Sequence, residues 1–298
     1  MIIKRLAFAL TTVVTLTFMS CGTGTTGNGD GDGKDTTKID SNKSLTVSVN
    51  GKIFSVPSPI QTAFLIKKTG APYTKDILNP SGSVNSYSTN YQKAINLGVY
   101  GADLGYVTLY DQTQDALGYF KSVKKLADDL GVSSAFDKTL LDRFTKNLGK
   151  KDSMLDLVSS AYRASDNFLK NNDRGDVGAL IIAGGWIESL YFASNVAKQK
   201  NQDEVVRRIA EQKTSLESLI GLMNANAGQE EYAELIKGLQ DLKSDFEGIT
   251  YKYTYDKPTT DEAHKTTTIT SRTEVTITPA QLESIAAKVA SLRKLIVG

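Results

Sequence analysis

Apolar side chains recur at three- and four-residue spacing along most of the chain from about residue 89 onward. This spacing places them on one face of a helix, and another element must cover that face. In residues 202–225, for example, Val205, Ile209 and Leu216 fall on one stripe. Short connections between such helices favour antiparallel neighbours. The pattern therefore predicts a mainly α fold built as an antiparallel helical bundle.

Glycines and polar breaks separate the predicted helices. A short helix over 59–69 should follow Pro57-Ser58-Pro59, and the final helix should begin after Thr278 and run to about Val297. Thr278 and Gln281 form a capping box around Pro279, a residue favoured at the first helical position. Residues 89–112 and 114–130 predict two helices or one bent helix that stops at Gly131. The other predicted helices cover residues 133–148, 152–171, 175–199, 202–225 and 229–246.

Two parts of the chain alternate apolar and polar residues with a period of two. Residues 45–56 contain Asn50-Gly51, a strong turn signal, and predict a small N-terminal β-hairpin. Residues 249–255 and 266–277 are rich in Tyr, Thr and Ile. They predict a C-terminal two-stranded β-ribbon that is closed by a loop over 256–265.

The first strand of this ribbon carries Tyr251, Tyr253 and Tyr255 on one face. We expect this aromatic face to cover the helical bundle. The alternative is that the ribbon recruits a partner strand by edge pairing.

The first twenty residues have the pattern of an export signal. A short basic start is followed by the apolar run 6–19, which is as long as a signal-peptide core and short for a membrane span. The run ends at Ser20-Cys21-Gly22, which resembles the bacterial lipobox, although Phe18 stands where Leu is usual. A plain secretory signal is the alternative. We expect acylation of Cys21, because two or three acyl chains hold a protein durably at a membrane.

Residues 22–43 are rich in Gly, Thr and Asp and contain one apolar side chain larger than alanine, Ile39. Such a segment cannot bury enough surface to order itself and predicts a flexible tether. The expected organisation is therefore a signal peptide over 1–20, a tether over 21–43 and a single mainly helical domain over 44–298.

The charge balance and the scarcity of Cys and His exclude several classes of function. Without Lys4 and Arg5 of the signal segment, 33 basic residues face 33 acidic ones, a balance that argues against nucleic-acid binding. One cysteine permits no intrachain disulfide. With Cys21 acylated and His264 the single histidine, we expect no His/Cys metal site, no His-dependent nucleophile and no cofactor.

Residues 94–110 are apolar on all sides, with Asp103 as their one charge, and should form the central helix. Gly98, Gly101 and Gly105 each cost about 1 kcal/mol relative to Ala in a helix interior. We therefore expect a neighbouring backbone to approach this helix closely.

Asp103 shares a helix stripe with Tyr100, Tyr106 and Tyr110. The expected role is a buried carboxylate whose hydrogen bonds come from these hydroxyls or from a helix end. The alternative is a ligand pocket in which burial raises the pKa of the acid.

A second unusual stretch is Gly184-Gly185-Trp186-Ile187-Glu188, inside the apolar helix over 175–199. The glycine pair predicts a kink or a helix contact. Trp186 is the single tryptophan and joins the candidate pocket residues. Glu188 could meet Asp103 across the core as a two-carboxylate site, but the spacing alone does not bring them together.

At these residues the chain resembles exported Bacteroidota lipoproteins of unassigned activity. The similar stretches are Pro57-Ser58-Pro59, Leu78-Asn79-Pro80, residues 97–104 and residues 184–188, so the resemblance covers roughly residues 57–200. It implies a helical fold and an outer-membrane lipoprotein on the periplasmic side or the cell surface. It supplies no reaction and no catalytic residue.

The expected function is therefore a lipid-anchored binding or interaction protein of the cell envelope. Its expected partners are the membrane, through the N-terminal acyl chains, and a protein of the envelope. The alternative is a small-molecule receptor or enzyme that uses Asp103 and Glu188.

Overall fold

The computed structural model places part of the chain, and all of the placed residues belong to the unit Ile39–Gly298. The described residues are 45–49, 52–132, 142–144, 146–147, 150, 152–160, 174–199, 203–225, 230–263 and 265–298. Cys21, the tether over 22–43 and His264 lie outside them. So do most of the helix predicted over 133–148 and the end of the helix predicted over 152–171.

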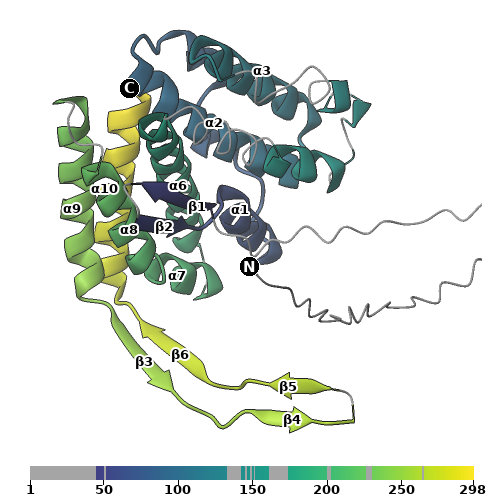
Figure 1. The fold of residues 1–298 in the computed structure, drawn as a ribbon, viewed down its shortest axis with the longest axis vertical. Coiled ribbons are helices and arrows are strands. Elements are labelled where there is room, and N and C mark those ends of the chain that lie inside the picture. Colours follow the sequence, from purple (N-terminus) through teal and green to yellow (C-terminus); the bar gives the residue numbers. More distant parts are fainter. Residues whose placement is uncertain are drawn as a thin grey trace, which may run out of the picture. The chain divides into compact units, whose positions relative to one another are not determined.

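The fold is mainly α-helical, as predicted, with small two-stranded antiparallel sheets (Figure 1). The helices are α1 (Pro59–Lys68), α2 (Asn90–Leu109), α3 (Thr113–Asp129), α6 (Gly175–Ala197), α7 (Asp203–Ala210), α8 (Lys213–Asn224), α9 (Ala233–Glu247) and α10 (Pro279–Val297). Residues 152–160 are also helical. Short 3-10 turns are η1 (Lys75–Ile77), η2 (Ser81–Asn85) and η4 (Glu230–Tyr232).

Helices α2 and α6 form the centre of the core, and glycines let their backbones touch. A Cβ atom added to Gly98 would lie 1.9 Å from the carbonyl oxygen of Ile181. A Cβ atom added to Gly184 would lie 1.9 Å from the carbonyl oxygen of Ile95. The prediction of close backbone approach is confirmed at Gly98, and the glycine pair of α6 marks a helix contact.

The two central helices run parallel to each other. Ile95 of α2 lies beside Gly184 of α6, and further along both helices the rings of Tyr106 and Phe192 are 4.9 Å apart. The prediction of antiparallel neighbours is wrong for this pair. α3 returns the chain to the starting end of α2, and Arg174, just before α6, donates to the Leu130 carbonyl there at 3.4 Å.

Two other helix pairs are antiparallel, as predicted. Lys93 near the start of α2 forms an ion pair with Asp129 at the end of α3, at 3.8 Å. Ser284 near the start of α10 donates a hydrogen bond to Asp245 near the end of α9, at 3.0 Å. A short connection joins α2 to α3, and the two strands of a ribbon join α9 to α10. In each pair the second helix therefore runs back along the first.

The single helix predicted over 202–225 is wrong, because Glu211 and Gln212 separate α7 from α8. The Gln212 side chain is buried, and both its amide nitrogen and its amide oxygen form hydrogen bonds. Its Nε2 donates to the carbonyl of Arg208 at 3.1 Å, and its Oε1 accepts from Trp186 Nε1, also at 3.1 Å. These bonds stabilise the break in the helix.

The start of α10 is confirmed. The Gln281 backbone N–H donates to Thr278 Oγ1 at 3.2 Å, and the Thr278 N–H donates to Gln281 Oε1 at 2.8 Å. Pro279 occupies the first helical position. The predicted inward face is buried, with Ile285 and Val289 at most 1% exposed.

Near the N-terminus, β1 (Leu45–Val49) pairs antiparallel with β2 (Lys52–Val56). The Asn50-Gly51 turn that should join them lies outside the described residues.

The C-terminal ribbon, which we define as residues 250–276, is longer than predicted. In it β3 (Thr250–Thr254) pairs antiparallel with β6 (Arg272–Thr276), and β4 (Thr259–Asp261) pairs with β5 (Thr266–Thr268) (Figure 1). The loop predicted over 256–265 is therefore wrong in extent, because it contains β4. Paired threonines extend the ribbon, with 3.1 Å between the Thr260 and Thr267 hydroxyl oxygens.

Among the described helices, α6 is long and apolar enough to cross a membrane, but 89% of its most apolar stretch is buried within the protein. A helix that is apolar all round is expected at the centre of a large core.

Candidate functional site

The structure brings Asp103 of α2 and Glu188 of α6 together. Both side chains are 0% exposed, and they are neighbours because the two glycine-lined helices pack so closely. Burial raises the pKa of Asp103 well above its usual value, and the adjacent Glu188 carboxyl adds to the increase. The two-carboxylate hypothesis is thus correct about proximity.

Arg293 of α10 binds the Glu188 carboxylate of this pair. Its Nε donates to Glu188 Oε2 at 2.7 Å and its Nη2 donates to Glu188 Oε1 at 2.9 Å, a bidentate contact. Nη2 also donates to the Ile77 carbonyl at 3.2 Å, and the guanidinium lies 4.4 Å from the centre of the Tyr191 ring. Burial raises the pKa of Glu188, and the bonds from Arg293 oppose this increase.

The cluster of two carboxyls and one guanidinium holds a proton. No donor among the described residues meets hydrogen-bond geometry at either Asp103 oxygen, although the Asn79 backbone N–H lies close by. Two ionised carboxylates repel each other, whereas a protonated Asp103 can donate to Glu188. The raised pKa favours the protonated form of Asp103, and with this form the buried cluster carries no net charge.

The three tyrosines of the candidate pocket do not bind Asp103, so the prediction that their hydroxyls satisfy this acid is wrong. Each hydroxyl bonds to the backbone of residues 71–80, which are held against α2 in this way. The bonds are Tyr100 Oη to the Pro80 carbonyl at 2.9 Å, Tyr110 Oη to the Ala71 carbonyl at 2.7 Å, and the Thr74 N–H to Tyr106 Oη at 3.1 Å. Burial raises the pKa of all three phenols.

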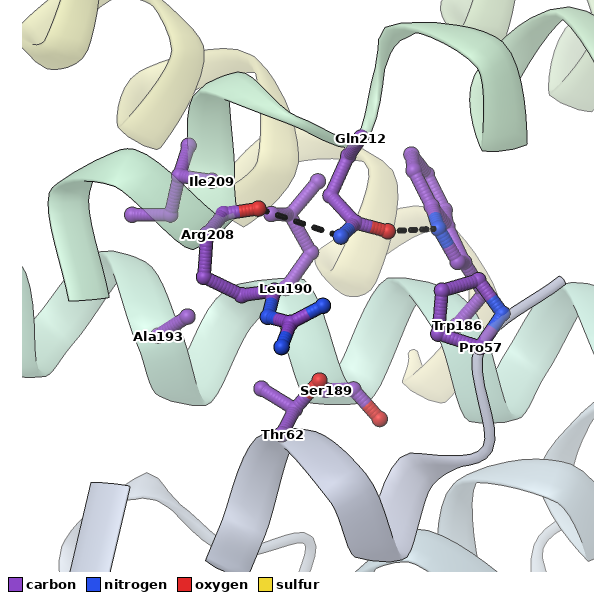
Figure 2. A pocket seen from close by; sticks show the side chains of 9 residues that line it. All are labelled: Pro57, Thr62, Trp186, Ser189, Leu190, Ala193, Arg208, Ile209 and Gln212. Carbon is purple, nitrogen blue, oxygen red and sulfur yellow. Dashed lines mark hydrogen bonds between the residues drawn. The ribbon is translucent and has the colours of Figure 1, made fainter. Parts of the chain in front are cut away.

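Trp186 lies in a different place, at a small cavity between α1, α6 and the α7–α8 break (Figure 2). The cavity volume is about 10 Å³, enough for about one water molecule. Its lining residues are Pro57, Thr62, Trp186, Ser189, Leu190, Ala193, Arg208, Ile209 and Gln212. Neither Asp103 nor Glu188 lines it, so the candidate pocket residues divide into separate groups.

Sequence reasoning missed Arg293 and Gln212. Arg293 follows Val289 by four residues on the inward stripe of α10, so helical spacing alone places it at the edge of the core. A charge on an apolar stripe was the available signal for a buried partner. Gln212 gave no comparable signal, because a long helix was expected to continue through it.

The ribbon contains a second group of unusual side chains. Four of the six large hydrophobic side chains that are exposed in the described residues belong to it. They are Tyr251, Tyr253, Tyr255 and Ile269, which are 38%, 63%, 66% and 71% exposed. All described residues of β4 and β5 are exposed too.

The base of this aromatic strand contacts the helices at Tyr251. The Tyr251 hydroxyl donates to the carbonyl of Ala210, and Lys213 Nζ lies 5.9 Å from the centre of the Tyr251 ring. Tyr253 and Tyr255 are largely exposed. The prediction that the tyrosine face covers the bundle is confirmed for Tyr251 and wrong for the other two.

Comparisons of the chain with family models, curated proteins and solved structures found no match. Within the described part of the chain, no group of three or more His, Cys, Asp or Glu side chains could hold a metal ion.

Proposed function

We propose that the protein is a lipid-anchored component of the cell envelope that acts by binding other macromolecules and not by catalysis. In this proposal Cys21 carries the acyl chains, and the protein faces the periplasm or the outside from the outer membrane. The helices form a bundle with the N-terminal hairpin, and the bundle supports the ribbon. The observation that carries the proposal is the concentration of exposed aromatic side chains on the ribbon.

The chemistry of the ribbon suits an interaction surface. Tyrosine offers a large, rigid contact area at low cost in conformational entropy, and its hydroxyl tolerates water when unbound. Each described ribbon strand has one strand neighbour, so its other edge offers N–H and C=O groups to a partner strand. Exposed apolar area gathered in one place is typical of a binding surface.

The ribbon can be tested with a photoreactive amino acid at position 253 in intact cells. We expect a discrete adduct of higher mass. The same probe at Lys121, an exposed position on α3, should give none. An absent adduct at position 253, or the same pattern at both positions, would contradict a binding role for the ribbon.

The anchor is supported by the sequence pattern at Cys21 and by the resemblance to exported lipoproteins. Replacement of Cys21 by Ser removes the thiol that accepts lipid. The variant should therefore no longer partition into the detergent phase, and it should carry no label when cells are supplied with a labelled fatty acid. A wild-type chain that takes up no label would refute the anchor.

The alternative is a receptor or enzyme that uses Asp103 and Glu188. Two adjacent carboxyls with raised pKa values are typical of acid–base sites, and this observation favours it. Against it, both side chains are 0% exposed and Glu188 is already bound at both oxygens by Arg293. We therefore assign the cluster a structural role.

A further inference from the structure

The end of β3 and the two residues that follow it have a self-complementary sequence. Residues 252–256 read Lys-Tyr-Thr-Tyr-Asp, with Thr254 at the centre. When two copies of this segment are aligned antiparallel about Thr254, Lys252 of each copy stands opposite Asp256 of the other. Tyr253 then stands opposite Tyr255, and Thr254 faces its own counterpart.

The edge that would carry this pairing has no strand neighbour in the described structure. β3 is hydrogen-bonded to β6 along one edge, and the two form a two-stranded sheet. The Tyr253 and Tyr255 side chains are 63% and 66% exposed. Within the described residues, no ion pair involves Lys252 or Asp256. Lys252 stands opposite Glu274 of β6 in the ribbon register, so Asp256 of a second copy would flank it from the other side.

We propose that the β3 edge of the ribbon pairs antiparallel with the same edge of a second copy of this chain, centred on Thr254. The proposal rests on the proposed function and names the partner of the ribbon. Such a contact is isologous, because each copy contributes the same surface and a two-fold axis relates them.

The charges select one register. The alignment about Thr254 creates two Lys252–Asp256 pairs and two Tyr253–Tyr255 pairs, and opposite charges and aromatic pairs both stabilise facing strands. Centring the pairing one residue earlier, on Tyr253, places Lys252 opposite Thr254 and removes both ion pairs. Centring it on Tyr255 places Lys252 opposite Pro258, which cannot donate to a strand ladder.

The helices reach this strand at Tyr251, whose hydroxyl contacts the Ala210 carbonyl. Thr254 lies three residues farther along, or about 10 Å of extended strand. In an antiparallel pair, the two sets of helices therefore lie on opposite sides of the two-fold axis. They are separated by about 20 Å along the strands.

Charge reversal provides a sharp test by sedimentation velocity of the detergent-solubilised full chain. Lys252→Asp places Asp opposite Asp twice, and Asp256→Lys places Lys opposite Lys twice. Each variant alone should dimerise at least about tenfold more weakly than wild type, since two cross-strand pairs change from attraction to repulsion. A mixture of the two variants should form heterodimers, because both opposed pairs are then attractive again.

The double variant Lys252→Asp with Asp256→Lys should dimerise like wild type, which separates pairing from loss of fold. Lys257→Asp makes the same charge change outside the five-residue segment and should leave the dimer unchanged. Failure of the mixture and of the double variant to restore dimers would overturn the proposal.

A monomeric wild-type chain would overturn it as well. If the probe at position 253 then still captures a different protein, the second-copy proposal fails and the binding function stands. If the probe captures nothing, both fail.

Discussion

The acid cluster in the core and the ribbon both concentrate unusual side chains, but they leave them in opposite states. In the core, Glu188 is bound at both oxygens by Arg293, and Asp103 is buried beside it with a raised pKa. On the ribbon, Tyr253 and Tyr255 are turned to solvent. The difference indicates that two acids with raised pKa values can serve the stability of the fold alone. Exposed aromatic side chains instead mark a surface that can bind a partner.

The largest expected effect comes from removing the cation of the core cluster. Arg293→Met leaves two buried carboxyls with no positive charge, so the free energy of unfolding should fall by about 3–5 kcal/mol in urea titrations. Lys294→Met, at the exposed next position, should change it by no more than about 0.5 kcal/mol. Equal losses in the two variants would mean that the cluster does not stabilise the fold.

A similar contrast tests the helix contact that brings the two acids together. Gly184→Ala introduces a Cβ atom 1.9 Å from the Ile95 carbonyl oxygen, and the forced separation of α2 and α6 should cost about 3 kcal/mol. In Gly118→Ala the new Cβ atom lies 3.5 Å from Ser81 Oγ, an ordinary contact. The control should be neutral or gain up to about 1 kcal/mol from helix propensity. Equal decreases in melting temperature for the two variants would contradict the close approach of α2 and α6.

Local features of the fold could be predicted from the sequence because they depend on neighbouring residues. The capping box of Thr278 and Gln281 and the apolar periodicity of α2 and α6 fix helices without reference to the rest of the chain. The glycines of α2 likewise indicate a close neighbour. In the capping box and in the apolar periodicity, the residues that matter lie within a few positions of each other, so a short stretch of sequence is enough to recognise them.

Long-range features could not be predicted in this way. The parallel direction of α2 and α6 depends on the path of the intervening segment, and the meeting of Asp103 and Glu188 depends on that direction. The break at Gln212 is stabilised by Trp186, a partner from another helix. The exposure of Tyr253 depends on where the ribbon leaves the helices, and alternation alone cannot show this.

A smaller effect sharpens the assignment of the proton to Asp103. Because burial raises its pKa, the native state keeps a proton that the unfolded state releases above about pH 4, the usual value for Asp. Stability should therefore fall as the pH rises from that value to the pKa of folded Asp103, by up to about 1.4 kcal/mol per pH unit.

Asp103→Asn keeps a donor toward Glu188 and removes the titration. Its stability, measured in urea between pH 5 and pH 9, should decline less steeply than that of wild type. Parallel curves for the two proteins would show that Asp103 is ionised in the folded state.

The smallest expected effect on stability lies on the ribbon. Tyr253→Ser with Tyr255→Ser removes side chains that are mostly in water, so the free energy of unfolding should change by no more than about 0.5 kcal/mol per residue. Tyr251→Ser should cost more, because it removes the contact with Ala210. A double variant that unfolds the protein would show that the outer tyrosines serve the fold.

The most direct test of a binding ribbon and a structural acid cluster is co-purification of partners with the tagged full chain from solubilised membranes. Capture should fall at least about tenfold for Tyr253→Ser with Tyr255→Ser, since aromatic anchors carry much of the energy of an interface, and should stay at the wild-type level for Asp103→Asn. The reverse result, capture lost with Asp103→Asn and kept without the two tyrosines, would contradict the account.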